Sequence, residues 1–358
     1  MKLRNLFLAS LAVCTMVSCS KDDDTNNAPK AEVDASLAFV ATSDILKTKA
    51  TEAGSAKEDF INKLDVYIFK GSDGNATLVN KKTETAKGTE TVSQIDHILV
   101  KVAPGATVDD PSTDQFVAYF MANCDDISAT TLSDFEKAVA AKSVESYTND
   151  ETSSSYKNLP MAKKISFSGV KPLINSNGDY VENWIQNGGS VKDNGGVAKD
   201  VHDKQAVTPP AGNVAVVVER LVARIQVEQI EVDLSAISTG ATFKLTDLAL
   251  ANVHTDVTPL GTVSAAGAGI WAKGYQGPEF SSKDAVVAPY ATTAPYDAAV
   301  SSLVKHYDGL DAVNKGTYSF GETTPKLVSY VYPNDGTDKF KYTAGSSAVG
   351  ETSEDANA

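Results

Sequence analysis

The sequence predicts an all-β fold with two antiparallel β-sandwich domains and one short helix in the first domain. The main observation is a series of segments in which apolar and polar residues alternate with the period of two typical of half-buried strands. A second observation is that no strand–helix–strand alternation occurs, as a parallel sheet would require. The length of 358 residues is compatible with about two domains.

The predicted strands follow one another through the body of the chain. They cover residues 64–69, 95–102, 116–121, 165–170, 213–218, 221–234, 243–253 and 326–332. In segment 221–234 the apolar positions change face after Val227, which indicates a bulge or a change of sheet. One helix is predicted over residues 133–142, because Ser133-Asp134-Phe135-Glu136 fits a capping box.

Composition divides the chain into segments. Residues 171–212 are rich in Asn, Gly, Asp and Lys and end in two prolines, so we expect a long insertion loop or an interdomain connection there. The domain boundary is therefore placed near residue 213, and the small, acidic residues 343–358 are expected to be disordered. The predicted parts are a signal peptide, a flexible acidic tether, an N-terminal domain and a C-terminal domain, at residues 1–18, 19–35, 36–212 and 213–358.

The N-terminus is typical of an exported protein. Lys2 and Arg4 precede an apolar stretch over residues 6–13, which is too short to cross a bilayer, since a span needs about 20 residues. Met16-Val17-Ser18-Cys19 resembles a lipobox, which implies cleavage between Ser18 and Cys19 and acylation of Cys19. The expected location is then the outer membrane and cell surface. A simple secretory cut is the alternative.

Three aspartates follow the predicted lipidation site. The run at residues 22–24 resembles the export signal that sends lipoproteins of Bacteroidia to the outer face of the outer membrane. The alternative is a flexible acidic tether without a sorting function.

Charge and missing motifs exclude several function classes. The formal net charge of -14 argues against nucleic acid as a partner, because binding phosphates requires a basic face. Once Cys14 is removed and Cys19 acylated, Cys124 stands alone, so neither a disulfide nor a cysteine metal site is expected. No nucleophile elbow, Walker loop or dinucleotide fingerprint occurs, so neither a cofactor nor an enzyme is predicted. The histidines are far apart, lack metal-ligand spacing and are expected at the surface or at sheet edges: His97, His202, His254 and His306.

Several short segments resemble those of the fimbrillin family, the type V pilins of Bacteroidia. They are an apolar strand at residues 37–41, a lysine-containing link at 46–50, a strand at 64–69, Phe120-Met121-Ala122-Asn123, Leu159-Pro160-Met161, and Arg220-Leu221-Val222-Ala223-Arg224-Ile225. Their order and spacing are fairly specific over residues 1–235, and the likeness is loose beyond.

This resemblance implies a structural subunit of a surface fimbria, or pilus, with transthyretin-like sandwich domains, that polymerises by donor-strand exchange. Its partners would be other fimbrial subunits, a processing protease and host or bacterial surface ligands. In the precursor, the removable first strand within residues 36–49 would fill the groove of an incomplete sheet. The apolar side chains of one face would plug that groove: Leu37, Phe39 and Ala41.

Proteolysis in the link would then free the first strand. No arginine occurs between residues 5 and 219, so the expected cut lies between Lys49 and Ala50, with Lys47 as the second choice. A protease different from the arginine-specific enzyme of the best-known family members would be needed. The alternative is a lysine-containing loop that is never cut.

Two further features qualify the resemblance. Family shaft subunits end in extended apolar donor strands, whereas this chain ends in small and acidic residues after Gly345, which indicates a truncated sequence or a subunit that only accepts a strand. Arg220 and Arg224 are expected to pair with carboxylates across the sheet or at the domain junction.

Other functions remain as alternatives. A fimbrial tip or anchor subunit would belong to the same family. A cell-surface glycan-binding lipoprotein would belong to another class and would need an exposed aromatic platform, for which Trp184 and Trp271 are the candidates.

Overall fold

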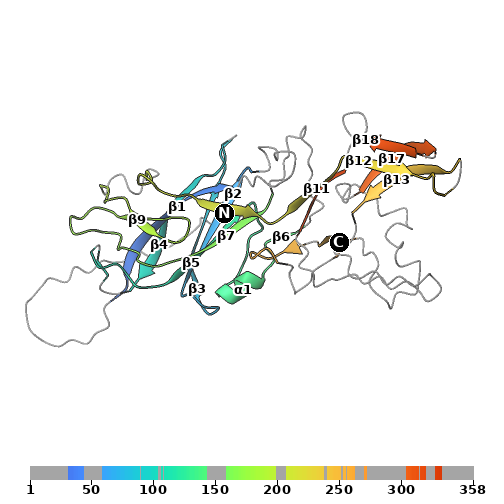
Figure 1. Ribbon diagram of the computed structural model, residues 1–358. Helices are drawn as coiled ribbons and strands as arrows, with labels where there is room; N and C mark the ends of the chain where they lie inside the picture. Colours follow the sequence, from blue (N-terminus) through green and yellow to red (C-terminus); the bar gives the residue numbers. More distant parts are fainter. Residues whose placement is uncertain are drawn as a thin grey trace, which may run out of the picture. The chain divides into compact units, whose positions relative to one another are not determined.

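The protein is described here by a computed structural model. The described residues are 31–43, 59–142 (without 89, 104, 105 and 108), 159–198, 207–237, 240–250, 253–254, 256–262, 270–271, 304–313, 315–319 and 327–332. Strands dominate them, and α1 (Leu132–Lys137) is the one α-helix in this part of the chain (Figure 1). The predicted all-β class is therefore confirmed.

The largest sheet contains nine strands. Its order is β3-β2-β5-β7-β10-β1-β8-β9, and β4 pairs with β1 outside this path. The strands are β1 (Val33–Ser43), β2 (Lys63–Lys70), β3 (Thr77–Thr85), β4 (Gln94–Val102), β5 (Phe116–Ala122), β7 (Met161–Phe167), β8 (Glu182–Ile185), β9 (Val191–Asp193) and β10 (Val216–Arg220).

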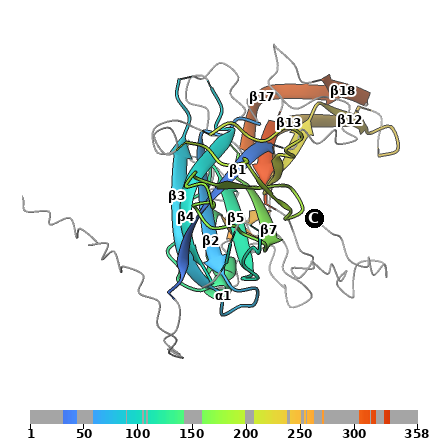
Figure 2. The same ribbon diagram turned by 90° about the vertical axis from the view of Figure 1, so that its left-hand side faces the viewer.

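The sheet folds over a single apolar core. Side chains of β1 and β4 meet those of β2, β5, β7 and β10 in one cluster, which includes Leu37, Phe120 and Val216. Figure 2 shows β2, β5 and β7 side by side, in agreement with their backbone pairing. Two layers that bury apolar side chains between them form a β-sandwich.

Strand β5 is buried on both faces. Phe116, Ala118, Phe120 and Ala122 face the sandwich core, and the alternate residues Val117, Tyr119 and Met121 belong to a second cluster with Phe135 of α1. A strand covered on both sides reads as a continuous apolar run rather than an alternating one, which explains its sequence.

The remaining strands form smaller sheets. β12-β18-β17-β13 is four-stranded, and β11 pairs with β19, β14 with β16, and β6 with β15. The strands are β6 (Ala141–Lys142), β11 (Ala223–Val227), β12 (Gln229–Asp233), β13 (Thr242–Ala249), β14 (Val253–His254), β15 (Asp256–Val257), β16 (Ile270–Trp271), β17 (Val304–Val313), β18 (Lys315–Ser319) and β19 (Leu327–Val331).

The predicted change of sheet after Val227 is confirmed. β11 pairs with β19, whereas β12, which begins two residues later, pairs with β18 in another sheet. The shift of the apolar positions in the sequence therefore marks a change of partner strand.

The predicted helix boundaries are wrong at both ends. The N-cap is Thr131, whose Oγ1 accepts a hydrogen bond from the Asp134 amide at 3.2 Å and donates one to Asp134 Oδ2 at 2.8 Å. Ser133 therefore lies inside α1. The helix ends at Lys137 because Ala140 donates its amide to the Val257 carbonyl at 2.7 Å, next to the pairing of β6 with β15.

The loop predicted over residues 171–212 is also wrong, because it contains β8 and β9. Trp184 and Ile185 are fully buried and draw this short segment into the sheet beside β1. Flanking Asn and Gly residues concealed the strand from pattern analysis.

Strand β1 starts earlier than expected. Val33 and Ala35, assigned to the flexible tether, pair with Val102 and Val100 of β4. Strand β10 lies beyond the predicted boundary near residue 213 but pairs with β1 and β7. The division into two domains remains a prediction, and its boundary fits better after Arg220.

Strand β4 is bordered on one side by side chains of the facing layer. Asn80 Nδ2 donates to the Leu99 carbonyl at 2.5 Å, and Lys70 Nζ donates to the Lys101 carbonyl at 3.1 Å. Lys82 donates in the same way to the carbonyl of Asp96. These three side chains, named the β4 border here, satisfy backbone acceptors that an adjoining strand would otherwise use.

Candidate functional site at the first strand

Both faces of β1 are buried. Leu37, Phe39 and Ala41 point into the sandwich core, where the Phe39 ring centroid lies 4.8 Å from that of Phe120. Ala38 and Val40 lie in a cluster on the opposite face with Trp184 and Val207. The strand therefore occupies a closed slot, with its faces arranged as the alternation in the sequence predicts.

Both edges of β1 are paired as well. Residues 33–40 pair antiparallel with β4. On the other edge, residues 36–38 pair with β8 and residues 41–43 with β10, and these are the parallel pairings among the described strands. The expectation of purely antiparallel sandwiches is therefore wrong at this strand. Removal of β1 would open backbone groups on three strands at once.

A buried polar cluster lies along the slot. The Glu182 side chain is fully buried, and its Oε1 accepts hydrogen bonds from Ser36 Oγ at 2.8 Å and from the His97 amide at 3.2 Å. Its Oε2 lies 3.1 Å from His97 Nδ1. Buried carboxylates persist in folded proteins only with such partners, because their desolvation is costly. These residues were missed by sequence analysis; their signal is a lone hydroxyl and a lone acid within apolar runs.

A β-bulge positions His97 beside Glu182. The pairing of β1 with β4 shifts between Leu37 and Phe39, so that Asp96 and His97 together face one residue of β1. His97 has a φ of 54°, in the left-handed region. Bulges redirect side chains in this way. His97 is partly buried, and His254 is 2% exposed, so of the two expected locations the surface is wrong for His254.

Asn123 fixes the chain just after the predicted processing link. Its Oδ1 accepts hydrogen bonds from the amides of Asn62 and Lys63 at 2.8 and 3.2 Å. Its Nδ2 donates to the carbonyls of Phe60 and Leu159 at 2.8 and 3.1 Å. Its φ of 56° is in the left-handed region, which asparagine tolerates better than most residues. The Ala-Asn motif thus has a structural role at the start of β2.

Charged side chains form a network at the same end of β2. Lys63 Nζ lies 3.0 Å from Asp65 Oδ2 and 2.7 Å from Asp126 Oδ1, and Lys81 Nζ lies 3.0 Å from Asp126 Oδ1. Hydrogen bonds from Lys63, and then from Lys81, lower the pKa of Asp126 from 3.8 to about 2.

This shift predicts an acid-dependent loss of stability. Because the pKa of Asp126 is lower in the folded chain than in the unfolded chain, its contribution is complete above about pH 4 and disappears as pH falls through about 2. Solvent screening limits the contribution to about 1 kcal/mol or less. Denaturant unfolding of wild type and Asp126→Asn should converge as the pH falls. The neighbouring exposed Asp125 supplies the control Asp125→Asn, and a parallel offset at every pH would contradict the expectation.

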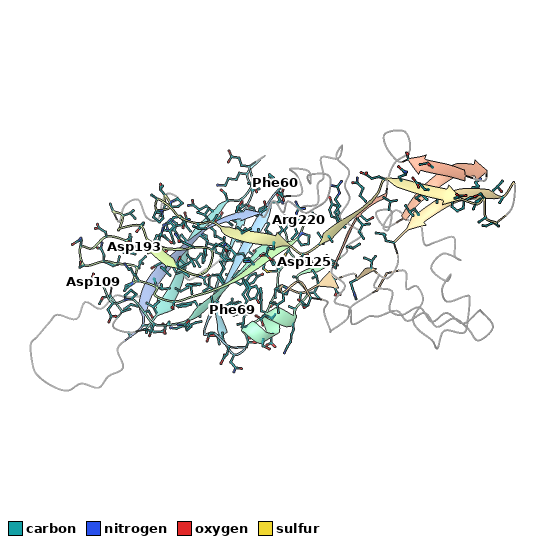
Figure 3. The ribbon with its side chains drawn as sticks, in the orientation of Figure 1. Phe60, Phe69, Asp109, Asp125, Asp193 and Arg220 are labelled. Carbon is teal, nitrogen blue, oxygen red and sulfur yellow. The ribbon has the colours of Figure 1, made fainter. Side chains whose placement is uncertain are left out.

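The two arginines of the junction motif lie on different strands. Arg220, labelled in Figure 3, ends β10. Its Nη2 lies 2.5 Å from Asp59 Oδ1, so the expected carboxylate partner is present. Arg224 lies in β11 and donates from Nη2 to Gln226 Oε1 at 2.5 Å. The contact with Asp59 places Arg220 close to the segment that follows the link.

Other sequence-predicted sites fall elsewhere. Ser18, Cys19, Lys49 and Ala50 lie outside the described residues, the last two within the link 44–58. In the described part of the chain, no helix is long and apolar enough to cross a membrane, and no group of potential metal ligands comes together. Cys124 is buried, which raises the pKa of its thiol and keeps it protonated.

One of the two tryptophans proposed for an exposed glycan-binding platform is buried. Trp184 is 0% exposed and packs beside Ala38 in the slot, so it cannot contribute an exposed surface. The side chain of Trp271 falls outside the described part of the structure.

Comparison with known proteins relates part of the chain to a family. The family described as the major fimbrial subunit protein (FimA) matches residues 35–208, which run from the third residue of β1 past β9 and stop before β10. A comparison with curated proteins found no match.

Similar solved structures include two fimbrial proteins. One is the tip fimbrial protein Mfa3 from Porphyromonas gingivalis with C-terminal truncation, at 15% identity over 87% of this chain and 70% of that chain, with a TM-score of 0.36. The other is a fimbrial assembly protein from Parabacteroides distasonis, at 12% identity over 87% of this chain and 81% of that chain, with a TM-score of 0.31. Both TM-scores are low, so the likeness depends on the sequence match: residues 35–208 of the chain match the family of major fimbrial subunit proteins.

Proposed function

We propose that the protein is a structural subunit of a surface fimbria, exported as a lipoprotein on Cys19 and polymerised by protease-gated donor-strand exchange. The observation that carries the proposal is the position of β1. It is buried on both faces, paired on both edges and followed by the lysine-containing link 44–58. A segment from a neighbouring subunit could replace it by strand addition, which supplies main-chain hydrogen bonds and side-chain contacts together.

The link controls the exchange through effective concentration. While β1 remains joined to β2, it competes for the slot as an intramolecular ligand at an effective concentration in the mM range. Cleavage at Lys49 removes this advantage but leaves β1 bound. Burial of Leu37 and Phe39 contributes about 1.5–3 kcal/mol each, and an incoming strand with similar side chains regains that energy.

Lipid anchoring and processing are connected in this scheme. The acyl chains on Cys19 and β1 lie on the same side of the cut, so cleavage alone would leave the subunit attached to the membrane. Displacement of β1 would release it into the growing polymer. A tip or anchor subunit that keeps its link intact would stay attached, and this is the alternative role within the family.

Limited proteolysis of the purified full chain tests the proposal. A lysine-specific protease should remove residues up to Lys49 and produce a ladder of polymers, because subunits with an emptied slot accept strands from one another. Mass spectrometry of the new N-terminus distinguishes Lys47 and Lys49 from Lys57, the third lysine of the link. The matched control is Lys47→Gln/Lys49→Gln/Lys57→Gln, which has no lysine left in the link and should remain monomeric. A cut chain that stays monomeric, retains β1 and binds polysaccharide would favour a glycan-binding protein instead.

Phe39→Asp separates the precursor from the polymer. Loss of the buried ring alone costs about 3–5 kcal/mol, and the buried charge adds to this, so the uncut chain should be strongly destabilised. The mature polymer, which has lost β1, should show the unfolding midpoint of the wild-type polymer in the same denaturant series. Equal destabilisation of the two forms would show that β1 is a permanent part of the fold.

A further inference from the structure

We infer that the slot selects its incoming strand by a hydroxyl side chain at the position of Ser36, through the buried carboxylate of Glu182. This inference rests on the proposed strand exchange and specifies the chemistry of the partner. It assigns a recognition role to Glu182, Asn183 and His97, which remain with the subunit when β1 leaves.

The slot contributes all but one of the groups in this polar cluster. Glu182 Oε1 accepts two hydrogen bonds. The bond from the His97 amide, at 3.2 Å, stays within the subunit when β1 leaves, whereas the bond from Ser36 Oγ, at 2.8 Å, is lost with β1. Ser36 and Glu182 are both 0% exposed, so water does not substitute at this position while a strand is bound. A strand with alanine here would leave a buried carboxylate oxygen with one hydrogen bond fewer, and an unmet bond to a buried charged group is costly.

The same cluster fixes the register of the bound strand. Asn183 Nδ2 donates to the Ser36 carbonyl at 2.9 Å and to the Lys171 carbonyl at 2.9 Å, so it joins β1 to a fixed loop. A slip of one residue would bring Leu37 to the carboxylate and turn Ser36 into the apolar core. The slot therefore requires a hydroxyl side chain, and it requires that side chain at one position of the bound strand.

Neighbouring contacts complete the recognition pattern. Ala38 pairs with Trp184, and both residues are 0% exposed, so a larger side chain at this position would have to displace buried neighbours. Phe39 fills the core between Phe120 and Phe167. The partner is thus an extended segment of another subunit that carries serine or threonine, a large apolar residue, a small residue and an aromatic residue in succession, as in Ser36-Leu37-Ala38-Phe39.

Peptide exchange on the cleaved full chain tests the inference. The chain is cut in its link by lysine-specific protease, with β1 still bound, and incubated with a fluorescent peptide of residues 31–43. Unlabelled competitors are the wild-type peptide and its Ser36→Ala and Ser43→Ala variants. Ser36→Ala should compete about tenfold less well, which corresponds to the loss of one hydrogen bond to a charged group. Ser43→Ala, the matched change at the end of β1, should compete like wild type.

The outcomes separate this inference from the proposed function. Uptake of the labelled peptide with equal competition by all three peptides would overturn the recognition role and leave strand exchange intact. Absence of uptake of the wild-type peptide would overturn strand exchange and the inference with it. In a chain carrying Glu182→Leu, the tenfold discrimination against Ser36→Ala should disappear, and its persistence would contradict the assignment to Glu182.

Discussion

Replacement of Leu37 by alanine is expected to lower the free energy of unfolding of the full chain by about 3–5 kcal/mol. Leu37 is 0% exposed and belongs to the core cluster between the two layers. Its removal leaves a cavity that the surrounding strands cannot close, because β1 is held on both edges by β4 and β8. Guanidinium unfolding followed by circular dichroism measures the change.

Leu99 supplies a matched control on the adjoining strand. It lies on β4 opposite Ser36, and its side chain is 51% exposed. Leu99→Ala should change the unfolding free energy by about 0.5 kcal/mol or less, as is usual for surface positions. If both leucine variants unfold at the same denaturant concentration as wild type, β1 does not contribute to the core in solution.

Asn123→Ala is expected to destabilise the chain by about 3 kcal/mol or more. The variant loses four hydrogen bonds to backbone groups, each worth about 0.5–1.5 kcal/mol net. Alanine at a φ of 56° adds about 1 kcal/mol of backbone strain. Thermal and denaturant unfolding of the uncut chain should both show the loss.

Two further variants separate the causes. Asn123→Gly removes the hydrogen bonds without the strain, so it should be about 1 kcal/mol more stable than Asn123→Ala. Asn75→Ala, in an exposed turn, should unfold like wild type. If Asn123→Ala behaves like Asn75→Ala, the bonds to Phe60, Asn62 and Lys63 do not hold the start of β2.

The fold class and most strand positions could be predicted from local pattern. Alternation located β4 and β19, and the change of face after Val227 located a change of sheet. The alternation of residues did not predict structure that depends on tertiary contacts. Burial of Trp184 places β8 in the sheet although the surrounding sequence resembles a loop. The helix α1 ends at Lys137, shortly before β6 pairs with β15.

The candidate site was only half visible in the sequence. Alternation assigned Leu37, Phe39 and Ala41 to one face of a strand. The contact between Ser36 and Glu182 joins residues 146 positions apart, and the parallel pairing that brings them together has no local signature. Such polar partners become apparent only when the strand order is known.

The β4 border has a consequence for the shape of any assembly. The backbone carbonyls on this edge of β4 could accept hydrogen bonds from a strand of another chain. Three of them already accept hydrogen bonds from Asn80, Lys70 and Lys82, two of which are positively charged. The charges of the two lysines are paired, that of Lys70 with Glu32 and Asp114 and that of Lys82 with Glu84 and Asp96. The border therefore acts by satisfying acceptors rather than by repulsion, and we expect two copies of the chain not to pair side by side along β4.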